Sequence, residues 1–150
     1  SVPVDSADAR ADVTRTVIAA APAAVFAAMS DPDRIVRWWG PDGFTSTNHQ
    51  FDFEAGGTWR LTMHGPDGTD YPNESRFTRL EPGALFEIEH LSGHHFILTI
   101  ELHPHPEGTE VSWRQTFDTV EHYRRLAAFV AGANAQNLER LRAEVVRGQG

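Results

Sequence analysis

The residue types available for chemistry are restricted in this chain. It has eight histidines and no cysteine, and all of its 13 basic residues are arginine. Thiolate nucleophiles, disulfides, cysteine-based metal sites and lysine chemistry are therefore excluded. Histidine, amide, hydroxyl and arginine side chains remain, and inside an apolar pocket that set favours binding over covalent catalysis.

The spacing of these residues gives no catalytic or metal-binding motif. His90 and His94 flank the turn 91–93, and 103–105 is a second close histidine pair, but neither has the His-Glu-x-x-His spacing of a helical zinc site. No serine lies in a Gly-x-Ser-x-Gly elbow, and no glycine loop precedes a helix to hold phosphate. The sequence predicts no metal, no cofactor and no assignable catalytic residue.

Length and charge limit the class of protein and its partners. The 150 residues fit one domain, and the formal charge is −8. Nucleic acids and anionic membranes attract basic stripes, which are absent here. The longest apolar stretch, 17–29, is shorter than the roughly 20 residues of a membrane span. We expect a cytoplasmic protein, monomeric or homodimeric, that binds neither nucleic acid nor membrane.

Hydrophobic periodicity predicts the elements that must position the polar groups. A first strand is followed by two short helices that begin at Pro22 and Pro32, then by six strands and one long helix with Asn134 at the centre of its apolar stripe. The fold class is α+β, with a curved antiparallel sheet of about seven strands around the helix. The expected ranges are 12–20 for the first strand, 44–53, 57–64, 71–80, 84–91, 94–103 and 109–117 for the others, and 118–146 for the helix. Residues 1–12 are expected to be a disordered tail, 13–146 the domain and 147–150 a second tail.

Six short motifs carry a resemblance to a known family. They are Ala21-Pro22-Ala23-Ala24-Val25-Phe26, Trp38-Trp39-Gly40-Pro41-Asp42-Gly43-Phe44, Gly56-Gly57-Thr58-Trp59-Arg60, Met63-His64-Gly65-Pro66-Asp67-Gly68, Tyr71-Pro72-Asn73 and Asn134-Ala135-Gln136-Asn137-Leu138-Glu139-Arg140-Leu141. The chain resembles the START-like superfamily called SRPBCC, and more closely the bacterial family named after the C-terminal domain of the activator of the heat-shock-protein-90 ATPase.

The resemblance covers residues 13–146 and implies a helix-grip fold. Such a fold has a cavity between the sheet and the last helix that often takes apolar small molecules, but it implies no single reaction. Many relatives carry tryptophan just after the glycine of the last helix, where this chain has Ala133, and the smaller residue widens the cavity unless a neighbour compensates. The eukaryotic co-chaperones carry a large N-terminal domain, whereas we expect only a short leader before this domain, so their ATPase activation is not expected to be carried over with the family name.

Alternation along the strands places large apolar side chains on one face, with a few polar groups among them. Asn134 is the polar residue most expected to orient a ligand, because leucine would pack better in its place. One of Trp38 and Trp39 is expected in the core and the other at the cavity entrance. Glu87 and Glu89 are expected on the opposite, solvent-exposed face. The predicted cavity residues are Trp39, His49, Phe51, Trp59, Leu61, Met63, Asn73, Phe77, Phe86, His90, His94, Phe96, Trp113, Gln115, Val130, Asn134 and Leu138.

Three functions follow as alternatives. The first is the binding of an apolar or amphipathic small molecule in a hydrophobic cavity, without catalysis. The second is a cyclase-, dehydratase- or hydrolase-like enzyme that acts on an apolar or aromatic metabolite, with His49, His90 or His94 as general base. The third is an interaction module like the chaperone-ATPase activator.

Overall fold

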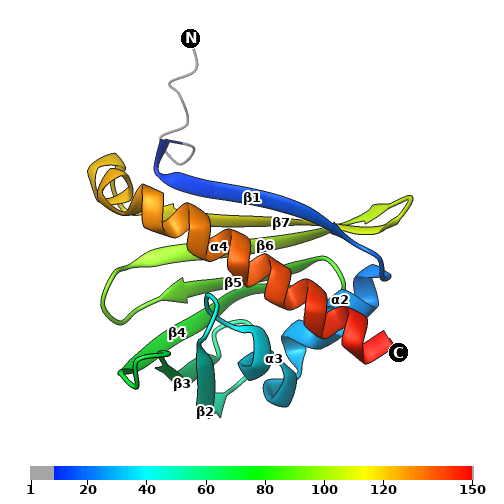
Figure 1. The fold of residues 1–150 in the computed structure, drawn as a ribbon, viewed down its shortest axis with the longest axis horizontal. Coiled ribbons are helices and arrows are strands. Elements are labelled where there is room, and N and C mark those ends of the chain that lie inside the picture. The colour runs from blue at the N-terminus through cyan, green and yellow to red at the C-terminus, as the bar shows by residue number, and fades with distance from the viewer. Residues whose placement is uncertain (1–8, 150) are drawn as a thin grey trace.

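A seven-stranded antiparallel sheet curves around one long helix (Figure 1) in the computed structural model, which describes residues 9–149. The strand order is β1-β7-β6-β5-β4-β3-β2, so that consecutive strands from β2 to β7 are neighbours and β1 joins β7. The predicted α+β helix-grip fold is confirmed. The elements are β1 (Ala11–Ile18), α2 (Pro22–Ser30), α3 (Pro32–Trp38), β2 (Thr45–Phe51), β3 (Thr58–His64), β4 (Asp70–Glu81), β5 (Leu85–His90), β6 (Phe96–His105), β7 (Gly108–Phe117) and α4 (Val120–Gln149).

The ends of the domain lie slightly further out than predicted. Strand β1 begins at Ala11, where it pairs with Thr116 of β7, so residues 11 and 12 belong to the sheet and not to a tail. Helix α4 continues to Gln149, through most of the expected C-terminal tail. Residues 9 and 10 of the predicted N-terminal tail are described, with Arg10 donating to the Phe117 carbonyl at 2.6 Å, and residues 1–8 lie outside the described residues. No helix within residues 9–149 is both long enough and apolar enough to cross a membrane.

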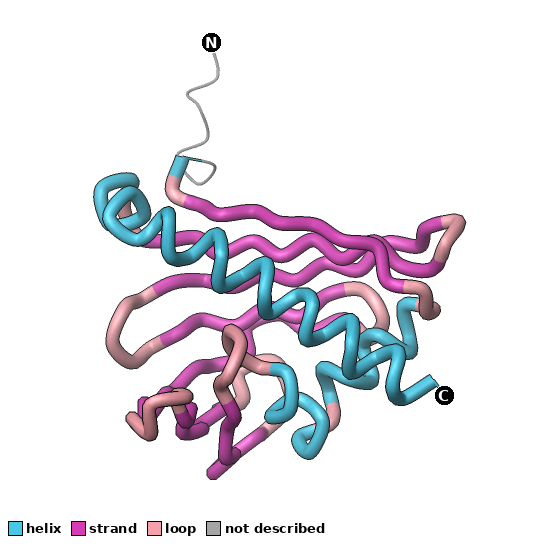
Figure 2. The backbone as a smooth tube through the Cα atoms, viewed as in Figure 1, coloured by secondary structure: helices cyan, strands magenta, loops and turns pink. Residues whose placement is uncertain are grey.

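All three helices lie on one face of the sheet (Figure 2). Both short helices have proline in their first turn, and the Asp31 side chain caps α3 by accepting from the Asp33 amide at 2.8 Å. On α4, Leu138, Leu141 and Val145 are almost fully buried. The sheet and the second half of α4 therefore enclose the hydrophobic core.

The prediction for the two adjacent tryptophans at the end of α3 is confirmed for the core residue alone, because both are buried, at 1% and 9% exposed, with ring centroids 5.5 Å apart. Trp38 is buried in the core, where its indole N–H donates to the Ala28 carbonyl at 2.9 Å. Trp39 points toward the sheet and packs edge-to-face on Trp59 with ring centroids 4.7 Å apart. Trp39 thus becomes part of a cavity wall.

Arg140 of helix α4 holds in place the loop that follows Trp38. The Arg140 guanidinium donates to five backbone carbonyls, those of Arg37, Trp39, Gly40, Pro41 and Phe44, at 2.8–3.2 Å. Burial lowers the pKa of Arg140 from its ordinary value, and Asp42 opposes that shift. The loop carbonyls accept no hydrogen bond from the backbone of a strand or helix, so Arg140 supplies the donors that regular secondary structure would otherwise provide.

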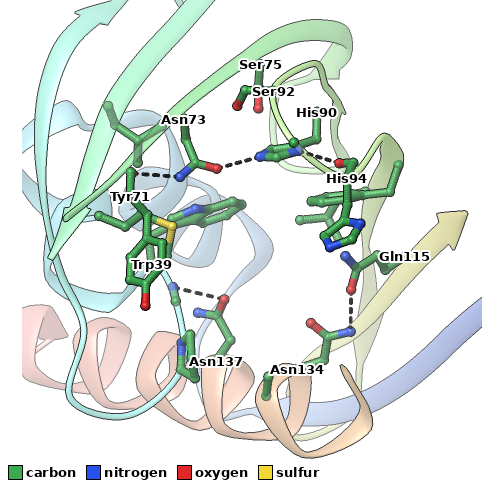
Figure 3. Close-up of a pocket in the computed structure, with 18 of the residues that line it drawn as sticks. Trp39, Tyr71, Asn73, Ser75, His90, Ser92, His94, Gln115, Asn134 and Asn137 are labelled. Atoms are coloured by element: carbon green, nitrogen blue, oxygen red, sulfur yellow. Dashed lines mark hydrogen bonds between the residues drawn. The ribbon is translucent and has the colours of Figure 1, made fainter. Parts of the chain in front are cut away.

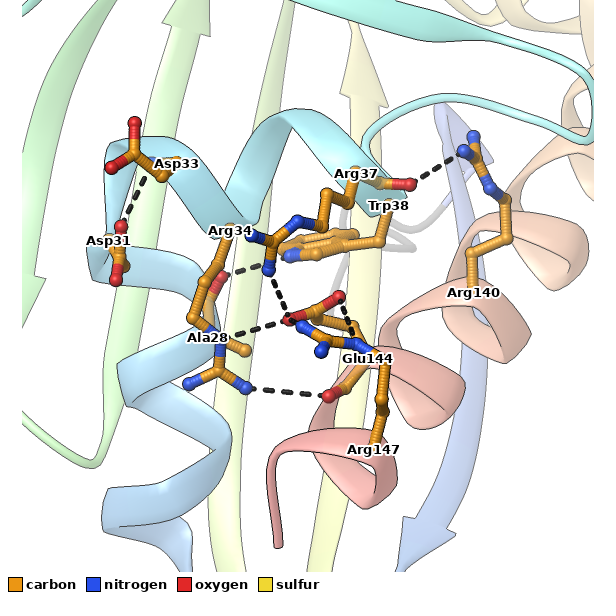
Figure 4. Close-up of polar contacts among 9 residues, drawn as sticks. All are labelled: Ala28, Asp31, Asp33, Arg34, Arg37, Trp38, Arg140, Glu144 and Arg147. Atoms are coloured by element: carbon orange, nitrogen blue, oxygen red, sulfur yellow. Dashed lines mark hydrogen bonds and ion pairs between the residues drawn. The ribbon is translucent and has the colours of Figure 1, made fainter. Parts of the chain in front are cut away.

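One turn further along α4, Glu144 ties the helix to α3 (Figure 4). Its carboxylate accepts from Arg34 at 3.0 Å, from Arg37 at 3.3 Å and from Arg147 at 2.6 Å. Burial alone would raise the pKa of Glu144, but the hydrogen bonds from Arg147 and Arg34 outweigh it and lower the pKa. The carboxylate therefore stays ionised and fixes the two helices against each other.

The prediction that Glu87 lies on a wet outer face is wrong. Glu87 is on the outer face but only 9% exposed, because Arg79, Thr78 and Thr99 cover it with hydrogen bonds of 2.8–3.0 Å. Desolvation would raise the pKa of Glu87, and these hydrogen bonds outweigh that effect and lower it. This carboxylate is a structural, ion-paired group.

Replacing Arg140 with methionine should leave several loop carbonyls without a donor. We expect the free energy of unfolding to fall by about 2–4 kcal/mol, measured by urea denaturation. Arg124→Met, at an exposed position of the same helix, is the control and should change it by less than about 0.5 kcal/mol. Equal stability of the two variants would contradict the role of Arg140.

Candidate functional site

A cavity of about 450 Å³ lies between the concave face of the sheet and the first half of α4. Small-molecule sites commonly have volumes of about 300–1,000 Å³. The tryptophans Trp39, Trp59 and Trp113 line one side, together with Leu61 and Leu98. Aromatic faces therefore make up much of the wall.

The position of Trp39 depends on its neighbours in the loop. Gly40 has φ +95°, a backbone conformation that favours glycine, and a Cβ there would lie 2.7 Å from the Met63 Cε, so the end of that side chain would have to move. Asn137 of α4 donates to the Trp38 carbonyl at 2.7 Å and accepts from the Gly40 amide at 3.1 Å. The backbone on both sides of Trp39 is thus hydrogen-bonded to α4.

Polar side chains from β4, β5 and the loop after β5 gather around His90 at the cavity (Figure 3). His90 occupies the centre of this group and stacks on Phe96, with ring centroids 4.5 Å apart. Its Nδ1 is 2.7 Å from the His94 carbonyl, and its Nε2 is 2.5 Å from Oδ1 of Asn73. Both ring nitrogens are therefore engaged by the protein, and burial lowers the pKa of His90 from its ordinary value of 6.5.

A second polar group joins the sheet to α4. Asn134 is 8% exposed and donates from Nδ2 to Oδ2 of Asp12 at 3.1 Å and to Oε1 of Gln115 at 3.0 Å. Asp12 belongs to β1 and Gln115 to the facing position of β7. The asparagine that interrupts the apolar stripe is thus tied to the two strands beneath it.

Most of the predicted cavity residues do line the cavity. Phe51, Phe77, Phe86 and Leu138 do not, because they pack into the core beside it. The predicted residues found in the lining are Trp39, Trp59, Leu61, Met63, Asn73, His90, His94, Phe96, Trp113, Gln115, Val130 and Asn134.

The placement of His49 on the concave face is wrong. The pairing of β2 with β3 shifts register between Asn48 and Gln50, so that His49 falls out of the alternation. His49 is exposed and bonds to the Thr62 hydroxyl at 2.7 Å, while Asn48 accepts from the Trp59 indole N–H at 2.8 Å. His49 therefore has no access to the cavity.

Strand alternation missed several lining residues, which lie in loops, at the start of β4 or on α4. Asn137 is three residues after Asn134, and this helical spacing is the one signal that could have marked it. Phe129 stands at the rim and is 71% exposed. The missed lining residues are Gly40, Pro41, Asp70, Tyr71, Pro72, Ser92, Gly93, Phe129 and Asn137.

Histidine and carboxylate side chains do not converge on a metal position. Within residues 9–149, no group of three or more such side chains is arranged to hold an ion. The two closest imidazoles at the cavity are those of His94 and His122, with Nδ1 and Nε2 3.0 Å apart.

The curved sheet around one long helix, with a cavity between them, defines a START-like protein of the helix-grip class. The model of the family described as "Activator of Hsp90 ATPase homolog 1-like protein" matches residues 19–145, and the chain belongs to this family. No match was found among curated proteins.

Solved structures of bacterial proteins have the same fold. A protein from Nitrosomonas europaea superposes with a TM-score of 0.86 at 15% identity, covering 94% of this chain and 97% of that one. A protein from Arthrobacter aurescens gives 0.85 at 24% identity, with coverage of 98% and 91%. An AHSA1-like protein from Aeromonas hydrophila gives 0.74 at 22% identity, with coverage of 93% and 94%. At these identities the likeness establishes the fold.

Replacing His90 with glutamine should remove a pH dependence of stability. Because the pKa of His90 is lower in the folded protein than the 6.5 of an ordinary imidazole, the unfolded chain takes up this proton more readily. The stability of the wild type relative to His90→Gln should therefore fall as the pH drops below 6.5, and level off below the folded-state pKa. Urea denaturation on both sides of this pH measures the difference, and a difference independent of pH would refute the assignment.

Proposed function

We propose that the protein binds a neutral, largely apolar small molecule in the cavity between the sheet and α4. The observation that carries the proposal is the combination of a cavity of about 450 Å³ with a wall of three tryptophans and a few polar groups. Among the described lining residues none is an arginine, and the one acidic side chain, Asp70, lies at the exposed rim paired with His64 at 2.7 Å. An anionic ligand would find no counter-charge in this lining.

Polar side chains in the lining support a ligand that is not wholly apolar. Asn73, Ser75 and Gln115 line the cavity beside the tryptophans. A few polar groups in a largely apolar pocket are what orients a bound molecule by hydrogen bonds. The ligand class is therefore amphipathic, with an apolar ring or chain and hydrogen-bonding groups.

A second candidate function is proton-transfer catalysis by His94. Of the three histidines considered, His49 lies outside the cavity and both nitrogens of His90 are engaged. His94 lines the cavity, and His122 orients it through Nδ1 at 3.0 Å, which leaves Nε2 free. His94→Gln should lower the hydrolysis of p-nitrophenyl acetate about a hundredfold if this candidate is right. Loss no greater than in His103→Gln, an exposed control, would refute it.

Filling the cavity should abolish binding without unfolding the protein. Ala133 lines the cavity, so Ala133→Trp should place an indole where the ligand lies, whereas Ala135→Trp on the exposed side of α4 is the matched control. Naphthol, followed by quenching of tryptophan fluorescence, should bind the wild type and the control alike, and bind Ala133→Trp at least tenfold more weakly. Naphthoate, its anionic counterpart, should bind the wild type more weakly than naphthol. Equal binding of naphthol by both variants, or no binding to the wild type, would contradict the proposal.

A further inference from the structure

We propose that Asn134 and Gln115 form a recognition edge for a neutral ring that carries an amide, with an N–H donor beside a carbonyl acceptor. This inference rests on the proposed binding function and names the class of ligand for the same cavity. In each of these two side-chain amides, one polar group is hydrogen-bonded within the protein and the other is available to a ligand.

Asp12 sets the orientation of Asn134. An ionised carboxylate only accepts hydrogen bonds, so the Asn134 atom that faces Oδ2 of Asp12 at 3.1 Å must be the amide nitrogen. Asp12 is 9% exposed and belongs to β1, which the sheet holds in register with β7. The carbonyl oxygen of Asn134 is consequently turned away from Asp12.

Asn134 in turn sets the orientation of Gln115. The same Nδ2 donates to Oε1 of Gln115 at 3.0 Å, and these two bonds use both of its protons. The Gln115 carbonyl is therefore occupied, and its NH2 group is left. Neither Oδ1 of Asn134 nor Nε2 of Gln115 has a protein partner among residues 9–149, and both face the cavity in Figure 3.

The free atoms present an acceptor and a donor from two side chains that are hydrogen-bonded to each other. A ligand N–H would donate to Oδ1 of Asn134, and the neighbouring ligand carbonyl would accept from Nε2 of Gln115. The aromatic wall of Trp39, Trp59 and Trp113 would then contact the faces of the ring. Asp12 accepts a hydrogen bond from Asn134, and its negative charge would repel an anionic ligand such as a carboxylate.

Three bicyclic compounds of similar size separate the contribution of the edge from that of the apolar wall. Carbostyril, the lactam of the quinoline ring, has both the donor and the acceptor, quinoline has an acceptor alone, and naphthalene has neither. Two hydrogen bonds should make carbostyril bind the full chain about tenfold more tightly than naphthalene, which makes none, and quinoline, which makes one, should lie between them, measured by calorimetry. Carbostyril, and not naphthalene, should also shift the side-chain amide signals of Asn134 and Gln115 in ¹⁵N spectra.

Gln115→Met removes the donor at nearly constant side-chain volume. It should weaken carbostyril about tenfold and leave naphthalene within about twofold of the wild type, which also shows that the cavity is intact. The control is Gln50→Met, the same substitution at a residue of β2 whose side-chain hydrogen bonds are exposed. It should change the affinity for neither carbostyril nor naphthalene. Asp12→Ala frees the Asn134 amide to rotate and should reduce the preference for carbostyril over naphthalene.

The outcomes distinguish this inference from the proposed function. If carbostyril and naphthalene bind the wild type equally, or if Gln115→Met weakens both alike, the recognition edge is overturned while binding in the cavity stands. If none of the three compounds binds, both the edge and the proposed function are overturned.

Discussion

The contacts between Arg140 and the loop after α3 are the interaction on which the rest of the site depends. The loop carries Trp39 but contains no regular secondary structure, and four of its carbonyls, together with that of Arg37 in α3, accept hydrogen bonds from this one side chain. Buried carbonyls without donors are costly, so the loop has this shape only while α4 is docked. The same docking places Asn134, less than two turns earlier, against Asp12 and Gln115.

Helix α4 has two different halves. Its C-terminal half packs Leu138, Leu141 and Val145 into the core and is further fixed by Glu144. Its N-terminal half presents the small Ala133 and the polar Asn134 to the sheet, where large apolar residues would have filled the space. The helix is anchored by one half, and the other half spans the cavity. This division explains how the protein maintains an open interior of about 450 Å³ beside a close-packed aromatic core.

Periodicity predicted the seven strands and the long helix, because alternation and the apolar stripe are local properties of the sequence. It placed one tryptophan of the adjacent pair in the core, but it expected the other at the cavity entrance, and both Trp38 and Trp39 are buried. It failed at His49, where one register shift changes the face of a residue, and at Glu87, whose burial depends on an arginine that folds over it. The bond between Asp12 and Asn134 joins residues 122 positions apart, so no local pattern could reveal it.

Binding of a neutral, amphipathic small molecule in the cavity is best tested by mass spectrometry of the compounds released when the purified protein is denatured, with Ala133→Trp purified in parallel. After exposure to a cell extract, we expect an uncharged compound with an apolar ring or chain to accompany the wild type and to be absent from the variant. Recovery of no compound from the wild type, or of the same compound from both proteins, would contradict it.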